Sequence, residues 1–355
     1  MIQAWALFVD AYRELNDRKL FWISLLLSAL GAGAFATVGV DERGLTLLWW
    51  SFDSRFFNST VVPPETFYKL LFVTLGVKFW LAWLATILAL VSTAGIIPDL
   101  VASGSVDLML SKPIGRARLF LLKFLTGLLF SGLQVTVFSL ASFVVIGLRG
   151  NAWEPGLFLA VPIVVLVYSY VFSMCALLGM VTRSTVASLL LTLLLWALTV
   201  GLWGASQAVA TGRTASRLEI QAIQRVIDVR RTRDGDEADT QALERELTEQ
   251  KEADGRWEVA DAIVGGVASV LPKTTATVEL LERWIADAAD LRLQRMDEES
   301  QRPLFGTKRV REKDLLKAMK EHRDALTPAW IIGTSLAFEA VVLGVAVLIF
   351  TRRDF

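Results

Sequence analysis

The side chains in this sequence that could take part in chemistry are few and stand far apart. The 355 residues include one cysteine, Cys175, and one histidine, His322. Cys175 lies in an apolar run where it has no partner for an intrachain disulfide, and His322 lies in the charged stretch KAMKEHRDAL. A zinc site built mainly from these two residue types is therefore excluded.

Motifs for nucleotide binding and for hydrolysis are missing as well. The chain has no G-x-x-x-x-G-K-[ST] segment to cradle phosphates. It has no G-x-S-x-G or H-E-x-x-H segment to suggest hydrolase chemistry. We therefore predict no catalytic residue, no metal site and no cofactor bound directly by this chain; if ATP drives the protein, another chain must bind it.

Composition places the chain among membrane proteins. Hydrophobic residues make up 54% of it and its mean hydropathy is +0.50, which is too apolar for an ordinary soluble domain. The formal net charge of zero hides a segregation, because residues 208–326 hold 21 of the 36 basic and 24 of the 36 acidic residues. The sequence therefore predicts an all-α, polytopic membrane protein with one large polar insert.

Six apolar runs are long enough to cross a bilayer, whose core needs about 20 helical residues. They are Leu20–Val38, Leu70–Ile97, Leu119–Leu148, Leu157–Val181, Thr185–Val209 and Ala329–Phe350. Residues 1–209 then hold five spans, residues 210–326 the insert, and residues 327–355 the sixth span and a tail. Ahead of the first span, Trp5, Phe8, Tyr12 and Leu15 recur every three or four residues, which predicts an N-terminal helix lying on the membrane surface.

Basic residues in the short loops indicate the orientation. With a cytoplasmic N-terminus, ten basic residues lie in inner segments and four in short outer ones, as the positive-inside rule requires. We therefore predict a multi-pass protein of the cytoplasmic (inner) membrane, with both termini cytoplasmic and residues 210–326 extracytoplasmic. The insert is then available to an extracytoplasmic partner. Nucleic acid is not an expected partner, because acidic residues match the basic ones.

Two ionisable residues lie inside predicted spans. Lys78 and Glu339 come roughly 12 and 15 Å below the outer edge, at about 1.5 Å of rise per residue. Ionisable groups at membrane depth usually face a partner or a wet cavity. The similar depths allow an ion pair between these two residues; in the alternative, Lys78 reaches outward to the lipid headgroups.

The segment between the second and third spans, SGSVDLMLSKPIGRARLFLLKFL at 103–125, is unusually polar for its place. It combines a short Leu-rich helix, a break at Pro113 and basic residues at 112, 116 and 118. A helix too short to span needs a surface to pack on. From the residues alone two interpretations remain open: a helix anchored at the membrane interface, or a docking element for a cytoplasmic partner.

This loop resembles that of type-2 permeases of ATP-binding-cassette (ABC) transporters, where a short helix is followed by a Ser-Lys-Pro break, an arginine, and a lysine one turn into the next span. The matching positions are Asp107–Leu110, Ser111–Pro113, Arg116 or Arg118, and Lys123. The surface helix, the six spans and the terminal RRDF are also similar to that family. One departure lies upstream, where many relatives carry Glu-x-x-Gly and this chain has Asp99, Gly104 and Asp107.

The resemblance implies a membrane subunit that works as one of two six-span halves, with a second copy of itself or a related permease. Each half docks on a separate cytoplasmic ATPase, which binds ATP and Mg²⁺, and the pair exports an unidentified substrate. The resemblance assigns the docking face to Asp99, Asp107, Leu108, Leu110, Ser111, Lys112, Pro113 and Arg116. The alternative function is a non-transporting scaffold or mechanotransmitting regulator of an extracytoplasmic partner, or an ATP-independent transporter.

The insert is predicted to be helical. SRLEIQAIQRVIDVRR has helical periodicity, RDGDEAD interrupts it at Gly235, and TQALERELTEQKEAD resumes a polar helix, which together indicate a helical hairpin. Further on, TTATVELLERWIADAADLRL forms an amphipathic helix. Its apolar face consists of Val278, Leu281, Trp284, Ile285 and Ala288.

Overall fold

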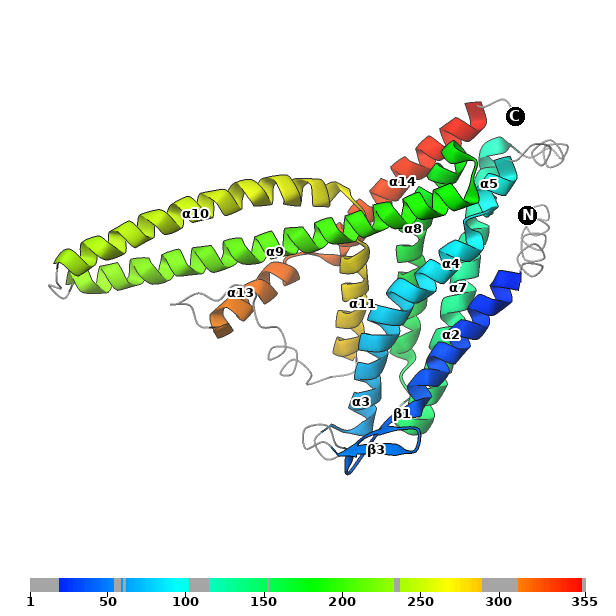
Figure 1. The fold of residues 1–355 in the computed structure, drawn as a ribbon, viewed down its shortest axis with the longest axis horizontal. Helices are drawn as coiled ribbons and strands as arrows, with labels where there is room; N and C mark the ends of the chain where they lie inside the picture. The colour runs from blue at the N-terminus through cyan, green and yellow to red at the C-terminus, as the bar shows by residue number, and fades with distance from the viewer. Residues whose placement is uncertain are drawn as a thin grey trace. The chain divides into compact units, whose positions relative to one another are not determined.

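The computed structural model describes residues 19–53, 59, 62–101, 115–151, 153–232, 237–288 and 312–352, most of which are helical (Figure 1). The helices are α2 (Lys19–Thr37), α3 (Pro64–Leu71), the π-helix η1 (Phe72–Ala85), α4 (Thr86–Thr93), α5 (Ile96–Val101), α7 (Arg116–Arg149), the 3₁₀ helix η2 (Pro155–Leu159), α8 (Ala160–Thr182), α9 (Thr185–Thr232), α10 (Glu237–Val270), α11 (Thr274–Ala288), α13 (Glu312–Asp324) and α14 (Pro328–Arg352). The strands are β1 (Val38–Asp41), β2 (Gly44–Leu47) and β3 (Trp50–Asp53).

Five helical stretches among the described residues are long and apolar enough to cross a membrane. They are Pro64–Val101, Arg116–Arg149, Pro155–Thr182, Thr185–Thr232 and Pro328–Arg352, and α2 carries a shorter apolar run, Phe21–Ala34. The chain is therefore a largely helical, multi-pass membrane protein. Five predicted apolar runs fall within these stretches, and the first, Leu20–Val38, falls on α2 except for Val38, which begins β1. Helix α9 continues well past Val209, where its apolar run ends.

The helices form two compact units. The first unit comprises residues 1–196, 274–291 and 336–355, and the second comprises residues 197–273 and 292–335. Helix α9 begins in the first unit and ends in the second, while α14 begins in the second and ends in the first. Helix α11 thus belongs to the first unit, although the sequence-based division at residues 210 and 326 counted it with the insert.

The core of the first unit lies where η1, α7, α8 and α11 meet, and Leu281 of α11 is fully buried in it. Phe138 of α7 stacks on Phe72 and on Trp80, with ring centroids 6.3 and 6.1 Å apart, which is a favourable separation for aromatic pairs. Helix α2 approaches η1 closely, because a Cβ atom at Gly31 would lie 2.6 Å from the Trp80 ring. Glycine is therefore required at that contact.

Residues 38–53 form a three-stranded antiparallel sheet of order β1-β2-β3, a small addition to the predicted helical architecture. Asp41 pairs with Gly44, and Leu47 pairs with Trp50, so that two-residue turns connect the strands. The turns are Glu42–Arg43 and Leu48–Trp49. Neither contains the Asn-Gly or Asp-Gly pair that usually marks such a turn in a sequence, which explains why the sheet was missed.

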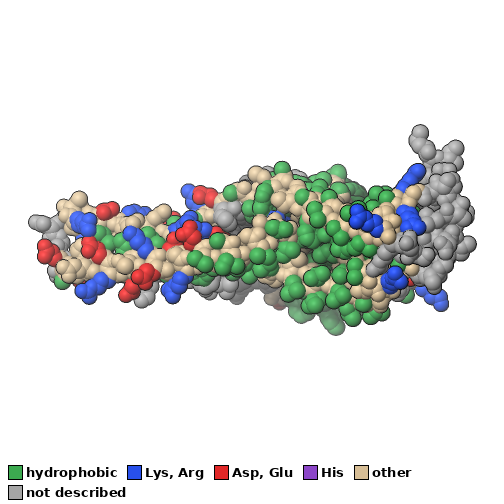
Figure 2. Space-filling model, turned by 90° about the horizontal axis from the view of Figure 1, so that it is seen from above, with side chains coloured by type: hydrophobic (Ala, Val, Ile, Leu, Met, Phe, Trp, Pro, Cys, Tyr) green, Lys and Arg blue, Asp and Glu red, His purple; other side chains and the backbone are tan. Residues whose placement is uncertain are grey.

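In the second unit, α9 and α10 lie antiparallel, and charged side chains gather along this pair (Figures 1 and 2). Ile223 and Ile227 of α9 bury their side chains against Leu243 of α10. The residues that connect the two helices, 233–236, lie outside the described ranges. The structure therefore contains both helices of the hairpin that was predicted around Gly235.

Other predictions fall on residues outside the described ranges. These are the surface helix within residues 1–18 and the docking segment within residues 102–114, and the side chain of His322 is likewise not described.

Candidate functional site

The structure describes two of the docking residues expected from the sequence, Asp99 and Arg116. The other six, Asp107, Leu108, Leu110, Ser111, Lys112 and Pro113, lie outside the described residues. Asp99 is an exposed residue of α5, and Arg116 is the first residue of α7. The two therefore flank the segment 102–114.

Helix α5, which directly precedes this segment, is packed inside the first unit. Its buried residues are Ile96, Ile97, Pro98, Leu100 and Val101, and it packs against α7 and α8. Pro98 lies directly over Gly179 of α8, where a Cβ atom would be 3.0 Å from Pro98 Cδ. The lack of a side chain at Gly179 thus allows α5 to approach α8 this closely.

Gly179 also lies at the corner between α8 and α9. Arg183 ends α8 in the left-handed conformation, with φ of 53°, and its N–H donates to the carbonyl of Gly179 at 3.0 Å. On the other side, the Cβ of Ser188 in α9 is 3.7 Å from the position that a Gly179 Cβ would take. Helix α5 therefore packs directly at the α8–α9 corner.

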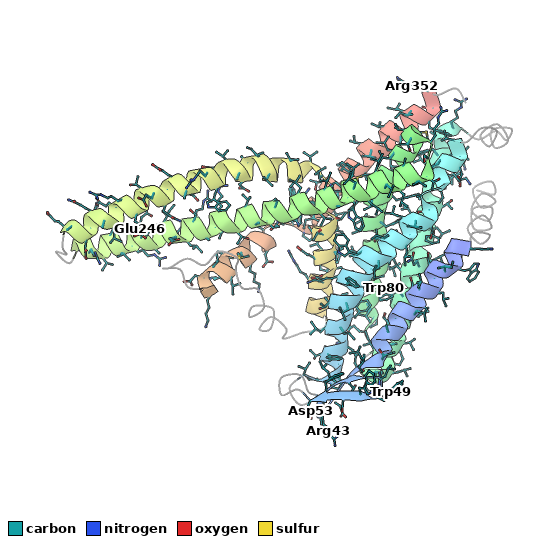
Figure 3. All side chains as sticks on the ribbon, viewed as in Figure 1. Arg43, Trp49, Asp53, Trp80, Glu246 and Arg352 are labelled. Carbon is teal, nitrogen blue, oxygen red and sulfur yellow. The ribbon has the colours of Figure 1, made fainter. Side chains whose placement is uncertain are left out.

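The second end of the segment is tied to α14. Arg116 Nη1 donates to the carbonyl of Thr351 at 3.4 Å, and the buried rings of Phe120 and Phe350 lie 5.9 Å apart. Figure 3 labels Arg352, the last residue of α14, at the end of the first unit opposite the sheet. Both flanks of the segment 102–114 are therefore joined to helices of the first unit, through α8 and through α14.

The two ionisable residues predicted inside spans do not bind each other. Lys78 Nζ of η1 lies 3.0 Å from Glu282 Oε2 of α11. Ser169 Oγ of α8 donates to Glu339 Oε2 at 2.9 Å. Each residue therefore has a partner other than the one that its depth suggested.

Glu282 is the functional candidate that sequence reasoning missed. It lies on α11, whose Val278, Leu281 and Ile285 are buried in the core of the first unit, as their amphipathic spacing indicated. The spacing gave the buried face of α11 but not the surface that this face covers. Lys78 lies on the π-helical segment η1, and such segments are rare and often mark functional positions.

A second ionic cluster stands where the spans approach the sheet. Lys69 Nζ lies 2.6 Å from Glu65 and 3.0 Å from Glu154, and its side chain is only 3% exposed. A buried charge is tolerated when it is paired in this way. The cluster joins α3 to the chain just before η2.

A family model described as "ABC-2 family transporter protein" matches residues 11–355, which is nearly the whole chain. No curated protein and no solved structure matches the chain significantly.

Proposed function

We propose that this chain, which belongs to the ABC-2 family of transporter proteins, is the membrane-spanning permease subunit of an ABC transporter. In this role it couples ATP hydrolysis by a separate cytoplasmic ATPase, which binds ATP and Mg²⁺, to the export of a substrate. The family match supports the role. The sequence supports the need for a second chain, because it contains no phosphate-binding loop of its own.

The proposal includes six spans, of which α2 is the first. The 19 residues of α2 give it a length of about 28 Å, close to the thickness of a hydrocarbon core. Both termini then lie on the cytoplasmic side of the inner membrane, and residues 210–326 lie on the other side. Two copies of the chain, or one copy and a related permease, complete the transporter.

In this proposal the docking element is the stretch from Asp99 to Arg116. One observation supports it: Pro98, which immediately precedes this stretch, lies on Gly179 at the α8–α9 corner. A movement of the bound ATPase pushes on α5, and the close contact passes the push to α8 and α9. Arg116 passes the same movement to the end of α14 through Thr351. Packed cores transmit such displacements because they compress little.

Affinity purification of the full chain from its own host tests the proposal. We expect a stoichiometric partner that contains a phosphate-binding loop, identified by mass spectrometry. Replacing Asp107, Leu108 and Leu110 together with Ser should remove that partner while the permease still elutes at its normal position. The matched control is Arg231→Ser on the exposed part of α9, which should retain it.

Two outcomes would overturn the proposal. If no ATPase accompanies the chain at native expression, the protein is an ATP-independent transporter or a scaffold. If the ATPase is retained by the triple variant, the docking element lies elsewhere on the cytoplasmic surface.

A further inference from the structure

The turn between β2 and β3 exposes an unusual set of apolar side chains. Trp49 is 79% exposed and Trp50 is 63% exposed, and Leu47, Leu48 and Phe52 are exposed beside them. We call residues 47–52 the aromatic tip. A patch of this kind on a folded surface usually marks a place where something else binds.

A backbone hydrogen bond holds the aromatic tip at the end of α2. The Leu48 N–H donates to the carbonyl of Thr37, the last residue of α2, at 2.7 Å. The Tyr68 hydroxyl donates to the carbonyl of Val38 at 3.1 Å, which fixes the first strand to α3. The tip is therefore kept at the level where α2 ends.

The exposed surface of α2 leads to this tip. Trp22, Leu26 and Leu30 recur every fourth residue on one face and are all exposed, so they form an apolar stripe along the helix. If α2 is the first span, as the proposed function requires, this stripe faces lipid. The aromatic tip, hydrogen-bonded to the last residue of α2, then lies at the depth where acyl chains give way to headgroups.

The sheet is polar at its opposite end. The exposed turn residues Glu42 and Arg43, with Asp41 beside them, lie across the sheet from the tip. Figure 3 shows Arg43 and Asp53 together at one end of the sheet and Trp49 at the other. This division suits a sheet with one end in the membrane interface and the other in water, because tryptophan rings favour the interfacial layer.

Leu48 provides an independent observation. Its φ of 56° lies in the left-handed region, which is unfavourable for leucine because of its Cβ and free of that cost for glycine. A large apolar side chain is thus kept at a strained position on the exposed turn. Strain of this kind points to a role for the side chain outside the fold itself.

We propose that the aromatic tip, residues 47–52, is a membrane anchor that inserts into the interfacial layer of the leaflet opposite the docking segment. Its partner is the lipid bilayer. The alternative occupant is a second copy of the chain, paired with the outer edge of β3. The tip favours lipid because Trp49 lies in the turn rather than on that edge, and because the tip is hydrogen-bonded to the last residue of α2, whose exposed stripe is apolar.

Spin labels at three positions test the anchor. Cys175 is the only cysteine, so the Cys175→Ala background allows single labels through Trp49→Cys, Arg43→Cys and Leu26→Cys. Each full-length variant is reconstituted in vesicles of phosphatidylethanolamine and phosphatidylglycerol. Power saturation then gives the accessibility of the label to oxygen, which is concentrated in lipid, and to a water-soluble nickel chelate.

We expect the label at 49 to meet the nickel chelate about three-fold less often than the label at 43, because the interface excludes polar solutes. Equal accessibility at 49 and 43 would overturn the anchor. Spin–spin broadening at 49 that disappears on dilution with unlabelled protein would also overturn it, in favour of contact with a second copy. The label at 26 separates the two proposals: if it is open to nickel, α2 is not a span, and the proposed topology fails rather than the anchor alone.

Discussion

Lys78 Nζ lies 3.0 Å from Glu282 Oε2, and this ion pair joins the π-helix η1 to α11. The two side chains differ in burial, since Lys78 is 51% exposed and Glu282 is 16% exposed. Helix α11 is thus held to η1 by a charge pair as well as by its buried apolar face. The pair also explains how an acidic residue and a lysine are tolerated beside an apolar helix.

Replacing Lys78 should destabilise the first unit more than replacing Glu282. Lys78→Met leaves a largely buried carboxylate without this cation, whereas Glu282→Gln leaves a flexible amine that can reach polar surroundings. We expect a loss of about 1 kcal/mol for Lys78→Met, because solvent screens the exposed lysine, and about half of that for Glu282→Gln. Thermal unfolding in detergent measures both losses.

A double-mutant cycle distinguishes this pair from one between Lys78 and Glu339. Lys78→Met combined with Glu282→Gln should show a coupling energy of about 0.5 kcal/mol or more, because the side chains are in contact. Lys78→Met combined with Glu339→Gln should be additive within about 0.5 kcal/mol, because Glu339 is held by Ser169 instead. Strong coupling in the second cycle would contradict the arrangement found here.

Arg213 should contribute more to the stability of the packing between α9 and α10 than any exposed arginine of the same helices. Its guanidinium donates to Asp261 at 2.6 Å and to Glu258 at 2.8 Å, so that it spans one turn of α10. Arg213→Met should raise the hydrogen exchange of amides around 258–261 by an amount equal to about 1–2 kcal/mol of local stability. The matched control, Arg231→Met, loses one exposed contact to Glu244 and should change exchange little. Equal effects of the two variants on hydrogen exchange would show that the two contacts of Arg213 add no local stability.

The sequence predicted the apolar helices well because hydropathy over about 20 residues is a strong signal. The run Leu119–Leu148 became α7, Arg116–Arg149, and Leu157–Val181 lies within η2 and α8. Hydropathy did not show that the fifth apolar run and the helix predicted at 216–231 form one continuous helix, α9. Backbone hydrogen bonds continue wherever the residues favour helix, so α9 extends into a polar segment beyond its apolar run.

The location of α11 was harder to predict for a different reason. Spacing identified Val278, Leu281 and Ile285 as one face, and these residues are buried. Periodicity says which side of a helix is covered, but not by what, and the many charges of residues 210–326 suggested an insert as a whole. The pairing of Lys78 with Glu282 depends on that placement, so depth along the spans alone pointed to Glu339 instead.

Lys273 should make stability depend on pH in the alkaline range. Burial lowers the pKa of Lys273 from its ordinary 10.5. The unfolded chain therefore binds more protons than the folded chain between the lowered pKa and 10.5, and stability rises with pH across that window. Below the lowered pKa both states are protonated and the full penalty remains. We expect the melting temperature of the wild type to rise relative to that of Lys273→Met between neutral pH and pH 10.5.

Lys273→Arg provides the control for that measurement. Arginine stays charged throughout this range. The melting temperature of Lys273→Arg should therefore not rise relative to that of Lys273→Met as the pH increases. The constant difference between variants reports other lost contacts, since Lys273 Nζ donates to Thr334 Oγ1 at 2.8 Å and lies 4.3 Å from the Trp330 ring centroid. A flat difference for the wild type would mean that the Lys273 ammonium is well solvated.

Gly179→Ala should weaken coupling between the ATPase and the permease without preventing docking. The added Cβ would lie 3.0 Å from Pro98 Cδ, so α5 must move away from α8, at a loss of about 1–3 kcal/mol in stability. The docking segment itself is unchanged, and the ATPase should still co-purify. Altered contacts along a coupling path shift coupling by about 0.5–2 kcal/mol, so ATP hydrolysis by the purified complex should change about two- to thirty-fold.

The matched control for Gly179 is Gly132→Ala in α7. There a new Cβ would meet only Val165 at 3.6 Å, an ordinary contact, and alanine favours helix over glycine by about 1 kcal/mol. Gly132→Ala should therefore be neutral or stabilising and should leave ATP hydrolysis unchanged. If both variants hydrolyse ATP at the wild-type rate, the contact of Pro98 with Gly179 holds the fold but carries no movement. If both variants lower the rate of ATP hydrolysis equally, any glycine-to-alanine change in a helix has this effect. The contact between α5 and α8 then has no special role in coupling.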